Sequence, residues 1–360
     1  MNSNDNTMQK IVKLLLLATL AAAITACHKD KPIEPTPDDS VVNIEVPDTP
    51  RYLAAAGGKL YVTCYRQPSV ARIDTASLRV EAVCPLGNYQ PEGIAIAGGK
   101  LFVASSWIAD ESGDIVRDDK IYVIDLASFS VTTTLTVGLN PQRVETLDGE
   151  HVVVNYLGDY GSNPGGSCII DAATLSVTQT GHEMTGFCTF DGLIYAYAAP
   201  YGSATVSFFS LDPTTLNVTP ILSNVTVSNT YGIRVIGGDV YVTSAPYNSN
   251  GDLCRYALDG TLQWQCEAGM FPNKVEPVGD GTAYVLNEGS WGSSNASLGR
   301  VTLSSGNTTQ NVFTPANGRN LGDIAQDVLV YGSKAYVTVS FSNTIEAVNI
   351  KDNKSTQIAM

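Results

Sequence analysis

Apolar residues occur along this chain in pairs of short runs that are separated by glycine and bounded by polar or aromatic residues. The stretch PEGIAIAGGKLFVASSW at 91–107 is typical: each apolar run has the length of a β-strand, and the Gly pair between them suits a tight turn. This pattern predicts two antiparallel strands that are covered on both faces. The polar and aromatic ends of the stretch should then lie together at one end of the strand pair.

The same strand–turn–strand pattern recurs about every 40 to 50 residues. The copies are 57–62 (GGKLYV), 98–103 (GGKLFV), 148–153 (DGEHVV), 191–196 (DGLIYA), 237–242 (GGDVYV), 280–285 (DGTAYV) and 332–337 (GSKAYV). A second motif follows the first five copies, at 73–78 (IDTASL), 124–129 (IDLASF), 170–175 (IDAATL), 211–216 (LDPTTL) and 258–262 (LDGTL), where Asp can cap a further turn. Each unit therefore predicts four antiparallel strands, named a to d from the centre outward. Seven units predict an all-β, seven-bladed β-propeller.

Closure of the ring needs an outer strand that joins the last blade to the first. Residues 41–46 (VVNIEV) precede the first unit in the way that a d strand precedes each later a strand, so we expect them to pair with blade seven. Such pairing removes exposed sheet edges. Whether residues 355–360 share this role stays open.

The N-terminus has the features of an export signal. Lys10 and Lys13 precede the apolar run 14–25, and the run ends in ITAC at 24–27. This tetrapeptide resembles the lipobox of bacterial lipoproteins, so we expect cleavage after residue 26 and a lipid on Cys27. Residues 28–40, rich in proline and charge, predict a flexible tether, and 41–360 the propeller. No later apolar run approaches the ~20 residues of a membrane-spanning helix, so the lipid is the only expected membrane attachment.

Charge and motif content narrow the possible functions. With 35 Asp and Glu against 21 Lys and Arg, the formal net charge is −14, which argues against nucleic acid and anionic lipid headgroups as partners. The chain contains no HExxH, G-x-S-x-G or P-loop motif. We therefore expect no catalytic residue, no bound metal and no cofactor.

The repeated GGKLYV…ID…L unit, which covers nearly all of 41–360, resembles that of the seven-bladed propellers called YVTN or YncE-like. With the lipobox, it resembles their lipoprotein branch in Bacteroidetes. The resemblance implies a lipid-anchored outer-membrane protein of the cell surface that binds vitamin B12 or another cobamide and delivers it to a TonB-dependent transporter. Since fold alone does not fix function, two alternatives stay open. One is a protein-interaction or cell-surface scaffold, and the other is a lactonase-like or lyase-like enzyme with a metal held by Glu92 or Glu183.

The candidate ligand site lies at one face, because the a strands of a propeller begin where its b strands end. Aromatic residues that follow the b strands are Tyr65, Trp107, Tyr156, Tyr160, Tyr201, Tyr247, Trp291 and Phe341. Residues at the start of the a strands are Arg51, Glu92, Arg143, Glu183, Tyr231, Arg234, Lys274 and Gln326. Rigid aromatic rings around polar groups suit a flat, partly apolar ligand. Its amide arms would find donors in Arg51, Arg143, Lys274 and Arg319, and acceptors in Glu92 and Glu183. For each residue taken singly, packing within the ring is an equal alternative.

Two further features bear on chemistry. The acidic stretch 108–120 lacks the D-x-D-x-D-G spacing of a calcium loop, so we interpret it as a solvated insertion. Cys254 and Cys266 flank the turn at 258–262. If Leu258 lies opposite Leu262, the two cysteines lie directly across from each other, and we expect a disulfide in an exported protein.

Overall fold

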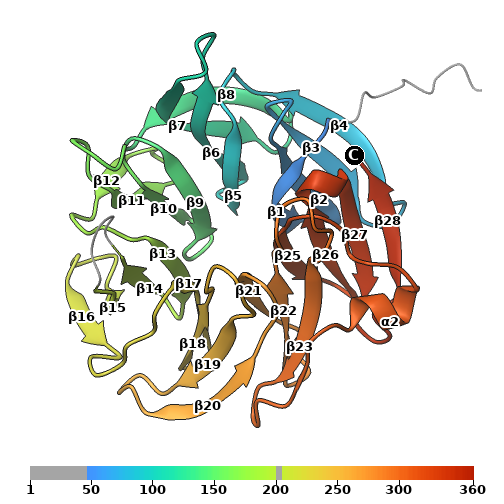
Figure 1. The fold of residues 1–360 in the computed structure, drawn as a ribbon. Helices are drawn as coiled ribbons and strands as arrows, with labels where there is room; N and C mark the ends of the chain where they lie inside the picture. The colour runs from blue at the N-terminus through green and yellow to red at the C-terminus, as the bar shows by residue number, and fades with distance from the viewer. Residues whose placement is uncertain (1–46, 200–204) are drawn as a thin grey trace, which may run out of the picture. The chain divides into compact units, whose positions relative to one another are not determined.

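The computed structural model describes residues 47–199 and 205–360, which form a ring of seven four-stranded antiparallel sheets (Figure 1). In every sheet the strands are arranged in sequence order, with strand a at the centre of the ring and strand d at its rim. The predicted all-β, seven-bladed propeller is confirmed. Within the described ranges the helices are α2 (Phe313–Asn317) and the short 3-10 turn η1 (Ser340–Ser342), and no helix there is long and apolar enough to span a membrane.

Each blade has its strands a to d in sequence order. Blade one is β1 (Pro50–Ala56), β2 (Lys59–Cys64), β3 (Ser69–Asp74) and β4 (Arg79–Pro85). Blade two is β5 (Pro91–Ala97), β6 (Lys100–Ala109), β7 (Ile115–Asp125) and β8 (Ser130–Thr136). Blade three is β9 (Pro141–Thr146), β10 (His151–Tyr156), β11 (Gly166–Asp171) and β12 (Val177–Gln179). Blade four is β13 (Gly186–Phe190), β14 (Leu193–Ala198), β15 (Ser207–Leu211) and β16 (Val218–Ile221).

The remaining three blades follow the same plan. Blade five is β17 (Thr230–Ile236), β18 (Asp239–Ser244), β19 (Asp252–Tyr256) and β20 (Leu262–Glu267). Blade six is β21 (Pro272–Pro277), β22 (Thr282–Asn287), β23 (Ser297–Thr302) and β24 (Thr308–Thr309). Blade seven is β25 (Ala325–Tyr331), β26 (Lys334–Val339), β27 (Thr344–Asn349) and β28 (Ser355–Ala359).

The turns have the chemistry that the two repeated motifs predicted. Gly57 and Gly58 have φ of 57° and 76°, a conformation that side chains with a Cβ rarely adopt, and they join β1 to β2 in the shortest possible hairpin. Between β3 and β4, Asp74 Oδ1 accepts a hydrogen bond from the Ser77 backbone N–H at 2.7 Å. These local bonds end each strand where the next must begin.

The hydrophobic core is divided among the contacts between blades. The buried apolar side chains of the described residues form seven clusters, and each cluster joins two neighbouring blades. The apolar b strands lie inside these clusters, as the fully buried Val152 and Val154 of blade three show. No blade buries its apolar faces alone, so the stability of each depends on both neighbours.

The ring closes where blade seven meets blade one. Leu53 and Leu60 pack with Tyr336 and Ile345 in one buried cluster. The strand pairing that we expected for residues 41–46 falls outside the described residues. Within them, β28 supplies the outer strand of blade seven, and its Ile358 is buried in the same cluster.

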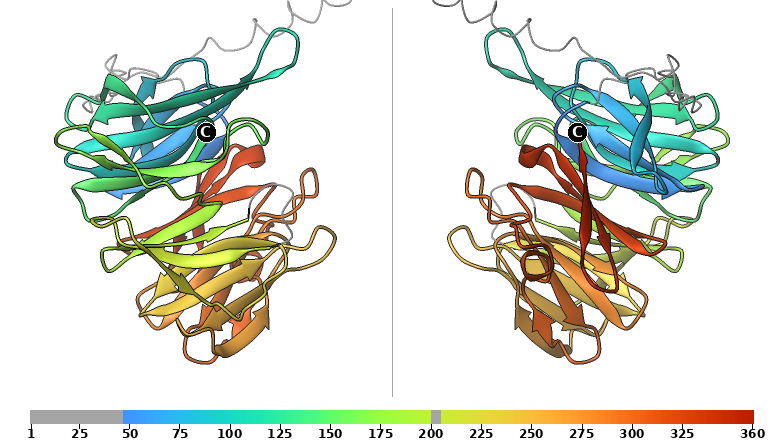
Figure 2. Two further views of the ribbon diagram at one scale, coloured as in Figure 1. Left: turned by 90° about the vertical axis from the view of Figure 1, so that its left-hand side faces the viewer. Right: turned by 90° about the vertical axis from the view of Figure 1, so that its right-hand side faces the viewer.

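The acidic stretch 108–120 is the end of a long hairpin. Strands β6 and β7 continue past the body of blade two, with Trp107 opposite Arg117, and the hairpin projects from the ring (Figure 2). At its tip, Asp110 Oδ1 accepts the backbone N–H groups of Ser112 and Asp114. This carboxylate therefore caps the turn, which accounts for its place in the loop without a metal ion.

The disulfide that we expected between Cys254 and Cys266 is not formed. In blade five Cys254 pairs with Gln265, and Cys266 pairs with Leu253, so the actual register differs by one residue from the expected one. Because residues directly opposite each other share a sheet face, the two thiols lie on opposite faces, and both are free. Cys254 packs in the cluster toward blade four, while Cys266 packs in the cluster toward blade six.

Candidate functional site

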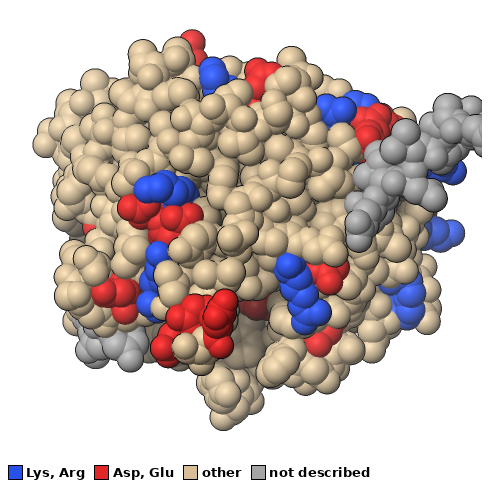
Figure 3. All heavy atoms as spheres, turned by 90° about the horizontal axis from the view of Figure 1, so that it is seen from above, with Lys and Arg blue, Asp and Glu red and all other residues tan. Residues whose placement is uncertain are grey.

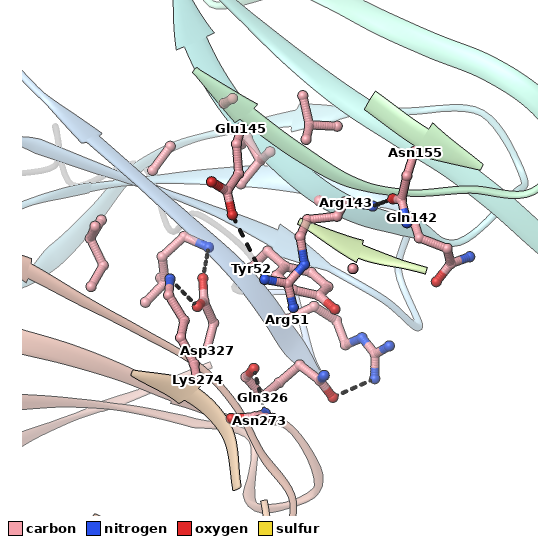
Figure 4. Close-up of a pocket in the computed structure, with 18 of the residues that line it drawn as sticks. Arg51, Tyr52, Gln142, Arg143, Glu145, Asn155, Asn273, Lys274, Gln326 and Asp327 are labelled. Carbon is pink, nitrogen blue, oxygen red and sulfur yellow. Dashed lines mark hydrogen bonds and ion pairs between the residues drawn. The ribbon is translucent and has the colours of Figure 1, made fainter. Parts of the chain in front are cut away.

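A central cavity of about 710 Å³ lies among the inner strands of the ring. We call the face where the a strands begin and the b–c loops lie the loop face, and the opposite face, with its a–b and c–d turns, the turn face. Six predicted site residues line the cavity and extend from five different a strands: Arg51, Arg143, Tyr231, Arg234, Lys274 and Gln326. Figure 4 shows Arg51, Arg143 and Lys274 reaching toward the common space.

The cavity wall carries both signs of charge. Its basic side chains are Arg51, Arg143, Arg234 and Lys274, and its acidic side chains are Glu145, Glu276, Glu288 and Asp327. On the side of the ring shown in Figure 3, by contrast, charged residues form small mixed groups separated by uncharged surface. The cavity therefore concentrates charge in a way that this part of the outer surface does not.

Arg51 is held by two neighbours from adjacent blades. Its guanidinium donates to both carboxylate oxygens of Glu92, at 2.8 to 3.1 Å. It also donates to Gln326 Oε1 at 2.9 Å (Figure 4). Glu92 is only 2% exposed, and burial raises its pKa while Arg51 opposes that rise. The predicted acceptor Glu92 is thus used inside the protein, where it ties blade two to blade one.

Tyr65 and Trp107 lie next to this ion pair. The Arg51 guanidinium is 4.7 Å from the centre of the Tyr65 ring, and Tyr65 meets Trp107 edge to face at 6.2 Å. Both aromatic side chains are half-buried. Four predicted site residues therefore form one packed cluster at the loop face, between blades one and two.

Carboxylates inside the cavity join neighbouring a strands. Asp327 Oδ2 accepts the Leu53 N–H at 2.9 Å, Glu276 Oε1 accepts the Val330 N–H at 3.0 Å, and Glu145 Oε2 accepts the Thr189 N–H at 3.2 Å. Asp327 also holds Lys274 Nζ at 2.7 Å (Figure 4). Each bond runs from one blade to the next, so these acidic groups help to fix the diameter of the channel.

A row of three aromatic rings leads from the cavity wall to the surface of blade five. Tyr231 lines the cavity, Phe271 lies 6.1 Å from it, and Tyr247 lies 6.5 Å beyond Phe271. Tyr231 donates its hydroxyl hydrogen to Glu288 Oε2 at 2.6 Å. Burial and the charge of Glu288 raise the pKa of this tyrosine, so the hydroxyl stays protonated. We call Tyr231, Phe271 and Tyr247 the aromatic row.

A second aromatic pair lies on blades six and seven. Trp291 and Phe341 lie 6.1 Å apart, and the Arg66 guanidinium is 5.8 Å from the centre of the Phe341 ring. Trp291 is 77% exposed and Phe341 45%. Large rings with so much exposed surface are unusual on a monomeric protein and mark a contact surface when they gather.

Other predicted site residues do not belong to the cavity. Tyr156 packs inside blade three and donates its hydroxyl hydrogen to Gln179 at 2.7 Å. Glu183 lies three residues before its a strand and, with Tyr160, lines a separate cavity of about 300 Å³. Arg319 was expected among the donors at the channel mouth. It follows α2 instead, and its two Nη atoms donate to the carboxylate of Glu346. Tyr201 lies outside the described residues.

The metal site of the enzyme alternative is not assembled by these residues. Glu92 is bound to Arg51, and Glu183 lines the other cavity. Within residues 47–199 and 205–360 there is no group of three or more His, Cys, Asp or Glu side chains placed to hold a metal ion.

Several site residues were missed from the sequence. The inward-facing Glu145 and Glu276 stand two residues after Arg143 and Lys274, and the period of two along a strand could have identified them. Phe271 had no such signal, because it precedes its a strand and takes a positive φ of 52° that bulky residues rarely adopt. Its place in the aromatic row depends on that backbone conformation.

Comparisons with known proteins support the fold alone. A scan with protein-family models finds no match, and a search of curated proteins finds no significantly similar sequence. Among solved structures, an uncharacterised protein of Listeria monocytogenes is similar with a TM-score of 0.55 and 11% identity, over 88% of this chain and 96% of that one. Hydrazine synthase of Kuenenia stuttgartiensis has a TM-score of 0.45 and 15% identity, over 86% and 80% of the two chains. A luciferin-regenerating enzyme has a TM-score of 0.45 and 13% identity, over 67% of this chain and 84% of that one.

Proposed function

We propose that this protein is an exported, lipid-anchored binding propeller whose loop face holds a small amphipathic ligand. From the resemblance to YncE-like lipoproteins, the proposed ligand is vitamin B12 or another cobamide, for delivery to a TonB-dependent transporter of the outer membrane. The single observation that supports binding most strongly is the aromatic row, because it joins the wall of the central cavity to the open loop face.

The exposure of these rings favours a contact surface over packing. Tyr247 is 82% exposed and Tyr231 39%, so much of their apolar area is left in water. A flat ligand that covers this area gains about 25 cal/mol for each Å² removed from water, and rigid rings lose little entropy on contact. The aromatic row therefore offers binding energy that the free protein does not use.

The cavity suits the polar part of such a ligand. Its volume of about 710 Å³ falls in the range of small-molecule sites, and its wall offers both donors and acceptors. A corrin ring is too broad to enter fully, so we place the ring over the cavity mouth and its amide arms toward Lys274 and Gln326. This pose uses the apolar rim and the polar wall together.

We propose binding without chemical turnover. Acid–base and metal-dependent reactions need carboxylates with free oxygens aimed at the substrate. Here both oxygens of Glu92 are bound to Arg51, and those of Asp327 are bound to Lys274 Nζ and the Leu53 N–H. Their engagement in the scaffold favours a binding role over the enzyme alternative.

Calorimetry of the purified protein with cyanocobalamin tests the proposal. We expect binding by the wild type and a loss of about tenfold or more in Tyr247→Ala, as for a central aromatic contact. Lys59→Ala is the matched control, since Lys59 lies on the turn face and contacts Asp74 and Glu81. No heat with the wild type would exclude the cobamide, and a larger loss in Lys59→Ala than in Tyr247→Ala would place the site on the wrong face.

The anchor has its own test, which does not involve the ligand. Cys27 lies outside the described residues, so labelling with a radioactive fatty acid is the direct measurement. We expect label in the wild type and none in Cys27→Ala. Equal labelling of both would remove the lipid anchor from the proposal and leave the binding face untouched.

A further inference from the structure

Two arginines in the central cavity lack the partners that other arginines of this ring have. Arg255 binds Asp239 and the Leu303 carbonyl, and Arg300 makes the matching bonds to Asp280 and Ile350. Arg143 of β9 and Arg234 of β17, in contrast, make no side-chain hydrogen bond within the described residues, although both line the cavity. Their guanidinium groups have unused donors that face a space large enough for a ligand.

One carboxylate is shared between the two arginines. Glu145 lies 3.7 Å from Arg143 Nη1 (Figure 4) and 3.9 Å from Arg234 Nη1, and both distances are too long for a hydrogen bond. Its Oε2 already accepts the Thr189 N–H. Burial and the charge of Arg143 lower the pKa of Arg234, but Glu145 and Glu276 raise it further, so both arginines stay charged. The two guanidinium groups therefore stay charged beside a shared carboxylate that makes no hydrogen bond to either of them.

Arg234 is also placed by a second, smaller cavity. Its Nε, Thr243 Oγ1 and Asn273 Oδ1 are buried without a protein hydrogen-bond partner, and all three residues line a cavity of about 10 Å³ beside the large one. That volume is about the space of one water molecule, which would accept from Nε and donate to Oδ1. Arg234 therefore lines both spaces, with its Nε in a polar niche and its Nη1 on the side of Glu145.

We propose that Arg143 and Arg234 form an oxyanion subsite in the central cavity, which binds a phosphate or carboxylate group. The planar guanidinium fork matches either group with two parallel bonds, and such bonds are about twice as strong as neutral ones. An oxyanion between the two arginines would supply the acceptors that Glu145 is too far away to provide.

This inference rests on the proposed function and narrows its ligand. A cobamide that carries its nucleotide loop has one phosphodiester, whereas cobinamide lacks that group. With the corrin over the cavity mouth and its amide arms toward Lys274 and Gln326, the phosphodiester also enters the cavity and reaches Arg143 and Arg234. The subsite thus selects complete cobamides over their incomplete precursors.

The first experiment uses inorganic phosphate as the probe, without any corrinoid. Titration calorimetry of the wild type should show phosphate binding, and Arg143→Gln and Arg234→Gln should each weaken it about tenfold. Arg79→Gln is the matched control, because Arg79 is exposed on the outer strand β4 and should bind phosphate as the wild type does. Arg143→Lys keeps the positive charge but loses the planar guanidinium. Its phosphate affinity should lie between those of the wild type and Arg143→Gln. Thermal melting of each variant checks that it is folded.

The second experiment identifies the source of the anion. Cyanocobalamin should bind about tenfold more weakly to Arg143→Gln than to the wild type, whereas cobinamide should bind these two proteins equally. In the wild type, phosphate should compete with cyanocobalamin. If the wild type does not bind cyanocobalamin but its phosphate binding depends on Arg143, the proposed cobamide ligand is wrong. The oxyanion subsite then remains, and another molecule supplies the anion.

Two outcomes would overturn the subsite. One is phosphate binding that is absent from the wild type or equal in Arg143→Gln, Arg234→Gln and Arg79→Gln. The other is tight cyanocobalamin binding that neither arginine variant changes, which would leave the binding function in place and remove the subsite from it.

Discussion

The aromatic residues after the b strands behave differently in two halves of the loop face. In blades one to three, Tyr65, Trp107 and Tyr156 are half-buried and contact neighbouring side chains. In blades five to seven, Tyr247 and Trp291 are 82% and 77% exposed, and Phe341 is 45% exposed. Apart from Tyr160 of blade three, which is 50% exposed, the same position in the repeat thus contributes to packing in one half and to open surface in the other.

The difference follows from what lies beneath each ring. Tyr156 covers Gly138 and Gly166, and a Cβ on Gly138 would lie 2.5 Å from the tyrosine ring. The glycines leave a space that the ring fills. Tyr247 has no such space, since its loop carries it over Phe271 at the surface. A ring packs into the fold where glycines leave a space for it, and it stays open to a ligand where its loop carries it to the surface.

The largest effect should come from the packed half. Glu92→Ala would leave the Arg51 guanidinium without its carboxylate partner in a place where water reaches it poorly. Removing one member of a buried ion pair costs roughly 3 to 5 kcal/mol of unfolding free energy. Urea denaturation measures the change. A loss no larger than that of an exposed substitution would show that this half is not held together by its ion pair.

Tyr156→Ala should have the next largest effect, and only on stability. It removes a half-buried ring together with the hydrogen bond to Gln179, for a loss of about 2 kcal/mol in unfolding free energy. Ligand affinity should stay at the wild-type value. Reduced affinity in a fully folded variant would mean that the packed half also contacts the ligand.

Trp291→Ala should show the opposite behaviour. The side chain is 77% exposed, so its loss should leave the urea midpoint almost unchanged. If the open half covers the ligand, cyanocobalamin affinity should fall about tenfold, close to 1.4 kcal/mol. Trp107→Ala is the matched comparison, with a larger loss of stability and a smaller loss of affinity. Equal behaviour of the two tryptophan variants would remove the distinction between the halves.

The fold was accessible from the sequence because a repeat reports on local structure. Gly57–Gly58 and Asp74 each fix a turn through their own backbone, and seven copies of that information predict seven blades. The site depends on contacts between blades, which no single repeat contains. Glu92 was predicted as a ligand acceptor, but its partner Arg51 comes from another blade. The register at Cys254 was missed for a different reason: an irregularity between Arg255 and Tyr256, within blade five, shifts the pairing by one residue.

The smallest effect should come from the turn face, where Lys59→Ala removes a lysine that lies between Asp74 and Glu81. All three side chains are partly exposed, and solvent screens such pairs so strongly that many contribute nothing measurable. We therefore expect no detectable change in cyanocobalamin affinity and the same urea midpoint as the wild type at physiological salt. The ion pairs of Lys59 should contribute measurably to the urea midpoint only at low ionic strength, where screening is weak. Urea denaturation across a series of salt concentrations measures this contribution to stability. A loss of cyanocobalamin affinity at any salt concentration would show that the two faces of the ring are coupled, because Lys59 lies too far from the loop face to contact a ligand there.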